Sequence, residues 1–242
     1  MNALPLLALT LMLIAPAAAG QGTLRVSASD SWAMPMLGYQ NGKPINGIFH
    51  DIYQRIGEKV GREVELLTMP RQRLQQAVER GEIDVRCYVS PAWLTESHHR
   101  YIWSMPFMIQ RDVLVARAPA TLPVEPEQLS GQRIGTVLGF VYTSLQPLFD
   151  SGTLIREDAR TQEQVLAMLR AGRLDYAVSN ELTLNWSNRG QGPRLYEVAE
   201  LDTDWVACLV RDDPEVPTMA ILRALVQMRL AGEFEAILDR YR

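Results

Sequence analysis

The sequence predicts an α/β protein built from two similar lobes, each a mainly parallel sheet flanked by helices. A helix–glycine–strand pattern occurs twice, at 77–85 (AVERGEIDV) and at 168–176 (MLRAGRLDY). In both copies apolar residues recur at i, i+3 and i+4 before Gly81 or Gly172, which suits the left-handed end of a helix. A single helix–glycine–strand match occurs in any α/β protein. The evidence for two similar lobes therefore depends on the segments that flank the two copies.

The flanking segments repeat in the same order. Strands are predicted at 24–28 and 63–67 in the first half, and at 133–137 and 154–156 in the second. Each half therefore has the order strand, helix, strand, helix, strand. This order implies a parallel sheet with right-handed crossovers in each half.

A proline-rich connector at 118–126 (APATLPVEP) separates the halves, after a predicted strand at 112–116. The chain ends with a predicted strand at 205–210 and a helical stretch at 218–241 that has an apolar face. Such a tail packs most simply on the first lobe, so the chain would cross between the lobes twice and form a hinge with a cleft. The expected limits are 20–115 with 206–242 for the first lobe and 116–205 for the second.

Charge and the amino terminus restrict the class of protein. The 242 residues carry a formal net charge of −4 with no basic block, so nucleic acid is not expected as a partner. Residues 1–19 hold no charged side chain and end in small residues, which predicts a secretory signal peptide. The alternatives are a buried helix or a membrane anchor, but the apolar run is shorter than the roughly 20 residues that span a bilayer. Cys87 and Cys208 could either pair after export or be two small buried apolar residues.

Four short strings carry a resemblance to a known family: 47–52 (GIFHDI), 81–84 (GEID), 103–107 (WSMPF) and 129–135 (LSGQRIG). Their order and spacing resemble the bacterial extracellular solute-binding proteins of family 3. The resemblance implies a type II periplasmic binding protein fold, in which two lobes joined by a two-strand hinge close on a small ligand.

The same resemblance implies a periplasmic monomer without cofactor that delivers its ligand to an inner-membrane ABC permease. A receptor that reports to a membrane sensor is the alternative. In the family topology the strand at 83–89 lies beside the one at 205–210, which would make Cys87 and Cys208 neighbours.

The ligand signature departs from that of the amino-acid receptors in this family. Ser97 stands where those receptors place the arginine that holds the α-carboxylate, and Phe140 stands near their threonine. Asn180, next to Glu181, stands where they place the aspartate that holds the α-ammonium. A buried ammonium needs a counter-charge, so these changes argue against an ordinary α-amino acid as ligand.

Other residues suggest a different pocket. Arg71, at the expected start of a helix, is either an anchor for an anion or a solvated arginine. Trp32, after the first strand, either lies on the floor of the pocket or belongs to the core. The remaining candidates follow predicted strands and should face the cleft. The candidate ligand-binding residues are Trp32, Arg71, Tyr88, Ser90, Trp93, Phe140, Tyr142, Asn180 and Glu181.

Enzyme functions are less favoured. The sequence has no nucleophile-elbow or phosphate-loop motif, and His50, His98 and His99 lack the spacing of a metal site. Cyclohexadienyl dehydratases share the resembled fold and use a carboxyl group as acid, so Glu181 or Glu96 could serve if buried. The sequence favours a non-catalytic binding protein.

Overall fold

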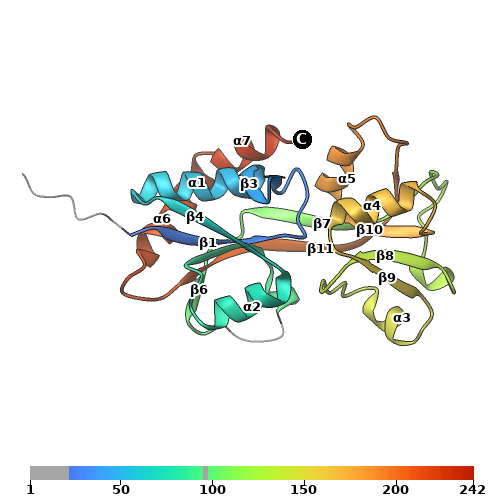
Figure 1. Cartoon of the computed structure of the whole chain (residues 1–242), viewed down its shortest axis with the longest axis horizontal. Helices are drawn as coiled ribbons and strands as arrows, with labels where there is room; N and C mark the ends of the chain where they lie inside the picture. Colours follow the sequence, from blue (N-terminus) through green and yellow to red (C-terminus); the bar gives the residue numbers. More distant parts are fainter. Residues whose placement is uncertain (1–21, 95–97) are drawn as a thin grey trace, which may run out of the picture.

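The computed structural model describes residues 22–94 and 98–242, so the predicted signal peptide at 1–19, Glu96 and Ser97 lie outside the described residues. The described strands form a nine-stranded sheet in the order β4-β1-β5-β11-β7-β10-β8-β9, with β6 paired to β11, and a separate two-stranded hairpin. Helices lie on both faces of the large sheet at both ends of the molecule (Figure 1). The predicted α/β class is confirmed.

The first lobe contains three parallel strands, with β1 (Leu24–Ser29) between β4 (Val64–Met69) and β5 (Val85–Val89). Helix α1 (Ile48–Val60) lies on one side of these strands and α2 (Arg71–Glu79) on the other (Figure 1). Because both faces are covered, β5 is buried along its whole length. The smaller elements of this lobe are β2 (Gly38–Gln40), β3 (Lys43–Asn46), η1 (Pro91–Trp93) and β6 (Tyr101–Trp103).

The second lobe repeats this arrangement, with β8 (Arg133–Val137) between β9 (Ile155–Ala159) and β10 (Tyr176–Asn180), all parallel. The predicted repeat is therefore present in both halves. Gly81 and Gly172 both have φ of 71°, a left-handed conformation that glycine adopts without strain. The helices and the 3-10 turn of this lobe are η2 (Pro126–Gln128), α3 (Gln146–Asp150), α4 (Gln162–Arg170) and α5 (Glu181–Ser187).

Two long antiparallel strands, β7 (Met108–Ala116) and β11 (Tyr196–Arg211), run through both lobes (Figure 1). β11 is much longer than the predicted strand at 205–210. Its first half carries polar residues and two register shifts, and its burial there is irregular, because the strand leaves one core before it enters the other. Residues 112–115 of β7 already pair with β10 of the second lobe. We therefore propose that the first crossing lies within β7, a few residues before position 115.

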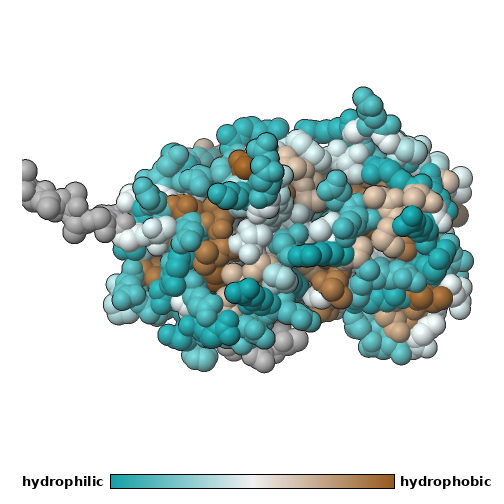
Figure 2. Space-filling model, viewed as in Figure 1, coloured by the Kyte–Doolittle hydropathy of each residue, from teal (hydrophilic) through white to brown (hydrophobic). Residues whose placement is uncertain are grey.

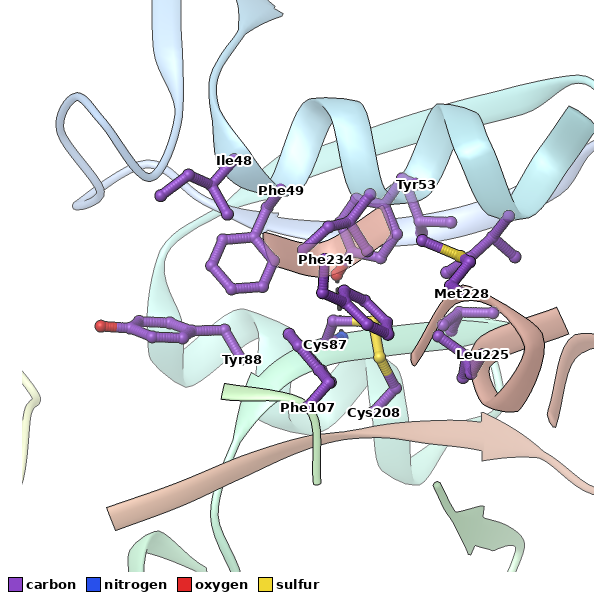
Figure 3. Packing of buried hydrophobic residues seen from close by; sticks show 14 of the residues in the cluster. Ile48, Phe49, Tyr53, Cys87, Tyr88, Phe107, Cys208, Leu225, Met228 and Phe234 are labelled. Atoms are coloured by element: carbon purple, nitrogen blue, oxygen red, sulfur yellow. Dashed lines mark hydrogen bonds between the residues drawn. A yellow bond between two sulfur atoms is a disulfide. The ribbon is translucent and has the colours of Figure 1, made fainter. Parts of the chain in front are cut away.

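The tail packs on the first lobe as expected, but it forms two helices. α6 (Thr218–Leu230) and α7 (Glu233–Asp239) are separated at Gly232, which has φ of 68° and ends the first helix. The apolar side chains of both helices join the first-lobe core beside α1, where Leu225, Met228 and Phe234 meet Phe49 and Tyr53 (Figure 3).

A disulfide between Cys87 and Cys208 lies inside this core (Figure 3). Cys87 is on β5 and Cys208 is directly opposite on β11, so the two cysteines are neighbours in the first-lobe sheet. Both side chains are buried. The bond therefore ties the returning segment of the chain to the first half of the lobe.

The surface is mostly hydrophilic over the face drawn in Figure 2, and its apolar residues form separate patches. Separate exposed apolar side chains are ordinary on protein surfaces. Across residues 22–94 and 98–242, no helix has the length and apolar character needed to cross a membrane.

Candidate ligand-binding site

A cavity lies between the two lobes, where loops follow the carboxyl ends of β1, β5 and β8. This is the place where open α/β sheets bind ligands. The hinge strand β7 adds Gln110 and Asp112 to its wall. A smaller hollow shares part of this wall and extends it toward α5. The main cavity is lined by Trp32, Arg71, Arg86, Tyr88 and Trp93 from the first lobe and by Phe140, Val141 and Tyr142 from the second, among others.

The two lobes touch where the loop after β1 meets the start of α4. Arg160 of the second lobe forms an ion pair with Asp30 of the first, at 2.9 Å between Nη2 and Oδ2. The backbone N–H of Gln162 donates to the carbonyl of Ser31 at 3.1 Å. This is the closed arrangement of a two-lobed protein.

Aromatic rings form the first-lobe wall. Trp32 lies with its ring centroid 5.4 Å from that of Tyr88 and 5.1 Å from that of Phe49, and Trp93 lies 5.7 Å from Tyr88 on the other side. Tyr88 has φ of 61°, which is uncommon for a residue with a Cβ. Such backbone strain gathers at ligand sites. Its ring packs near Phe49 while its hydroxyl points away from the disulfide (Figure 3).

Arg71 is the first residue of α2 and reaches across the cavity to the second lobe. Its guanidinium carbon lies 4.9 Å from the centroid of the Phe140 ring. No carboxylate in the described part of the chain forms an ion pair with it. Burial lowers the pKa of Arg71, and the electrostatic effect of Tyr142 acts in the opposite direction. The structure thus places Arg71 at the cavity, where its side chain is partly buried.

Arg86 is a second arginine in the same wall, and the sequence analysis missed it. It lies on β5 and only 6% of its surface is exposed. Nη1 donates to Oε1 of Gln75 at 3.1 Å, a neutral partner. Burial, and after it the charge of Arg71, lower the pKa of Arg86 to about 10. A charged residue within an otherwise apolar strand was the signal that could have found it.

Asp112, also missed, faces the cavity from the hinge strand β7. It accepts a hydrogen bond from Nε2 of Gln110 at 2.9 Å. Burial raises its pKa to about 7, and repulsion from Asp202 and Asp204 acts in the same direction. Oε1 of Gln110 is buried and lacks a partner within the described residues, so this wall also offers a free hydrogen-bond acceptor.

Comparison with known proteins identifies the chain. A model of the bacterial extracellular solute-binding proteins, family 3, matches residues 24–242. The chain belongs to this family. Among curated proteins, no sequence matches it.

Several solved structures resemble this solute-binding protein. An ancestral arginine-binding protein bound to arginine has 23% identity, covers 92% of this chain and 99% of its own, and gives a TM-score of 0.74. The amino acid ABC transporter substrate-binding protein AbpA from Streptococcus pneumoniae, bound to L-arginine, has 16% identity, with coverages of 90% and 94% and a TM-score of 0.71. A histidine kinase sensor domain with similarity to periplasmic binding proteins has 24% identity, with coverages of 90% and 95% and a TM-score of 0.71. At these identities the likeness shows the shared type II fold.

Most of the candidate residues of this solute-binding protein come together at the cavity. Ser90 does not line it. Its hydroxyl donates to Oδ1 of Asp204 at 3.2 Å, and Nε1 of Trp93 donates to Oδ2 of the same carboxylate at 2.8 Å. Asp204 on β11 therefore fixes the loop that carries Trp93, while the Trp93 ring lines the cavity. Ser90 therefore helps to hold the cavity wall through Asp204 and does not face the ligand space.

Asn180 and Glu181 lie at the start of α5 and point to different places. Oδ1 of Asn180 accepts from the backbone N–H of Thr183 at 2.8 Å and caps the helix, beside the smaller hollow. Glu181 is 37% exposed and forms an ion pair with Arg111 at 2.9 Å, in a separate groove. The structure therefore does not bring Glu181 to the cavity. It also lacks the burial that a general acid would need.

A metal site has no support within the described ranges, where no group of three or more His, Cys, Asp or Glu side chains could hold an ion. The cavity therefore offers three kinds of contact from this chain. It has aromatic faces, a free amide oxygen and two arginines without a carboxylate partner in the described residues, beside the carboxyl of Asp112 already described. Aromatic walls with few polar groups are typical of small-molecule sites.

Proposed function

We propose that this family 3 solute-binding protein is a periplasmic receptor that closes its two lobes on a small anionic ligand. The observation that carries the proposal is Arg71, which is enclosed between the lobes without a carboxylate among the described residues. A buried charge is costly unless it is paired. An anionic ligand would supply the missing partner and favour the closed arrangement, because Arg71 contacts Phe140 of the second lobe only when the lobes meet.

The cavity does not favour a cationic amino acid. Two of the similar structures are bound to arginine, whereas this cavity already contains Arg71 and Arg86. A guanidinium ligand would be repelled there, since like charges at short range in a low dielectric oppose each other. Asn180 is uncharged, and its side-chain oxygen caps α5, so it offers no counter-charge for an ammonium group. The carboxyl of Asp112 lines the cavity, but burial raises its pKa to about 7 and keeps it neutral below that pH.

The protein's role is binding without catalysis, and its partner is a membrane protein. We propose transport through an ABC permease as the main role, because family 3 proteins are solute-binding proteins and AbpA is named as a transporter component. The likeness to a histidine kinase sensor domain supports the second candidate, a receptor for a sensor. A permease gene and an ATPase gene beside this one would favour transport, and a sensor kinase gene would favour signalling.

A thermal-shift screen of the purified protein tests the proposed ligand class. The screen would compare carboxylates, amino acids, polyamines and short peptides. A ligand at 100 times its Kd stabilises the folded state by about 2.7 kcal/mol. We expect the carboxylates to raise the melting temperature of the wild type and of Arg73→Ala. They should leave the melting temperature of Arg71→Ala unchanged. Arg73 is the matched control because it is exposed on the same helix.

The proposal would be wrong in two cases. Stabilisation by ordinary amino acids or polyamines alone would contradict the anionic ligand. Stabilisation by carboxylates in Arg71→Ala as strong as in the wild type would show that the anion binds elsewhere on the protein.

A further inference from the structure

We propose that Arg71 and Arg86 act together on a ligand whose head group carries two negative charges, as in a dicarboxylate or a phosphate monoester. This inference rests on the proposed function and narrows its ligand class. The two arginines come from different elements, α2 and β5, and line the same cavity.

Both arginines keep unused hydrogen-bond donors. A guanidinium has five N–H donors. Arg71 donates no hydrogen bond to any described residue, and Arg86 donates one, to the neutral amide of Gln75. Neither is paired with a carboxylate in the described chain. Guanidinium groups of this kind match the paired oxygens of carboxylates and phosphates.

The charge of the cavity wall favours a ligand with two negative charges while Asp112 is protonated. Arg71 and Arg86 each contribute a positive charge, and Asp112 is the one acidic residue that the described chain adds to this wall. Asp112 hydrogen-bonds to Gln110 and not to either arginine. The wall therefore keeps a net positive charge whether or not Asp112 is ionised. A single carboxylate could contact both arginines, as Asp84 contacts Arg25 and Arg211 elsewhere in this protein, but it would neutralise only one of the two positive charges.

The two arginines carry like charges in one cavity, and the charge of Arg71 lowers the pKa of Arg86. Among the described residues, the side chain of Arg86 has one neutral hydrogen-bond partner, Gln75, and no carboxylate partner. A ligand with two charges removes the repulsion and pairs both groups at once. The aromatic faces of Trp32, Tyr88 and Phe140 suit an apolar or planar body attached to that head group.

Calorimetric titration with benzoate, phthalate and phenyl phosphate tests the inference, since these probes share one ring and differ in head-group charge. We expect the wild type to bind at least one of the two dianions at least about tenfold more tightly than benzoate. Arg86→Gln should weaken the tighter dianion by about 10- to 150-fold, as for the loss of a charge-assisted hydrogen bond, and leave benzoate within about threefold. Arg73→Gln, on the exposed side of α2, is the control and should change none of the three.

The outcomes separate the inference from the proposed function. Tighter binding of phthalate would indicate a dicarboxylate ligand, and tighter binding of phenyl phosphate would indicate a phosphate monoester. Wild-type binding of benzoate as tightly as of both dianions would overturn the inference and leave the proposed anionic receptor intact. An equal loss of all three probes in Arg86→Gln would show a structural role and also overturn it. No binding of any probe by the wild type would contradict both proposals. A melting temperature of free Arg86→Gln equal to or above that of the wild type would support the assignment, because an unpaired buried charge is removed.

Discussion

The protonation of Asp112 should couple stability to pH, and Asp112→Asn is the substitution that reveals it. Burial raises the pKa of this carboxyl from 3.8 to about 7 in the folded protein. Between about pH 4 and pH 7 the folded state therefore holds a proton that the unfolded chain has released. The free energy of unfolding should fall as the pH rises across this window, by up to about 4 kcal/mol from this group alone.

Asp112→Asn keeps an oxygen that can accept from Gln110 and removes the charge. We expect its free energy of unfolding to match that of the wild type near pH 4 and to exceed it near pH 8, where Asp112 is ionised. Urea denaturation at a series of pH values measures the difference. Asp239→Asn, at an exposed carboxylate paired with Arg242, is the control and should not produce this pattern. Parallel pH profiles for Asp112→Asn and the wild type would refute the reasoning.

The same group should act on ligand binding. A neutral Asp112 leaves the cavity wall more positive, so anion affinity in the wild type should weaken as the pH rises through about 7. In Asp112→Asn the affinity should stay nearly constant over this range. Calorimetric titration at about pH 6 and about pH 8 compares the two proteins. Equal pH dependence in both would mean that another group controls binding.

Replacing both Cys87 and Cys208 with alanine should lower the free energy of unfolding by up to about 5 kcal/mol, because the bond joins residues separated by 121 positions. Urea denaturation measures the free energy of unfolding, and a midpoint equal to that of the wild type would contradict the predicted loss. Asp30→Asn removes the ion pair with Arg160 between the lobes and should weaken the tightest-binding anion by no more than about fivefold, since the pair is exposed. A larger loss in titration calorimetry would place Asp30 in the ligand site. Glu233 has a pKa lowered to about 2, first by the hydrogen bond from Arg55. Its contribution, below about 1 kcal/mol because the pair is partly exposed, is present above about pH 4.5 and lost toward about pH 2. The free energy of unfolding of Glu233→Gln should therefore approach that of the wild type only in acid. A difference between the two proteins that persists at about pH 2 would show that it does not come from the charge of Glu233.

Local patterns in the sequence were enough to predict the two lobes. The glycines at 81 and 172 mark helix ends by a backbone conformation that the residue itself favours. The full length of β11 could not be predicted, because residues 196–204 cross between the lobes and their burial depends on both. The break in the tail at Gly232 was missed because the apolar spacing continues through it.

The site was less predictable than the fold. Residues that follow strands could be assigned to the cleft, and Trp32, Tyr88 and Phe140 lie there. Arg86 lies within a strand whose two faces are both covered, so periodicity gave no sign that one side chain reaches a cavity. Glu181 was expected at the ligand because it stands next to the position where the family's amino-acid receptors place an aspartate, but the turn into α5 directs it to Arg111.

A crystal structure of the wild-type protein with its tightest-binding anion would test the central claim most directly. We predict that the lobes are closed and that the anion's oxygens lie within hydrogen-bond distance of the Arg71 guanidinium, with the body of the ligand between Trp32 and Phe140. An anion bound instead in the groove that contains Glu181 and Arg111, with Arg71 untouched, would contradict the account.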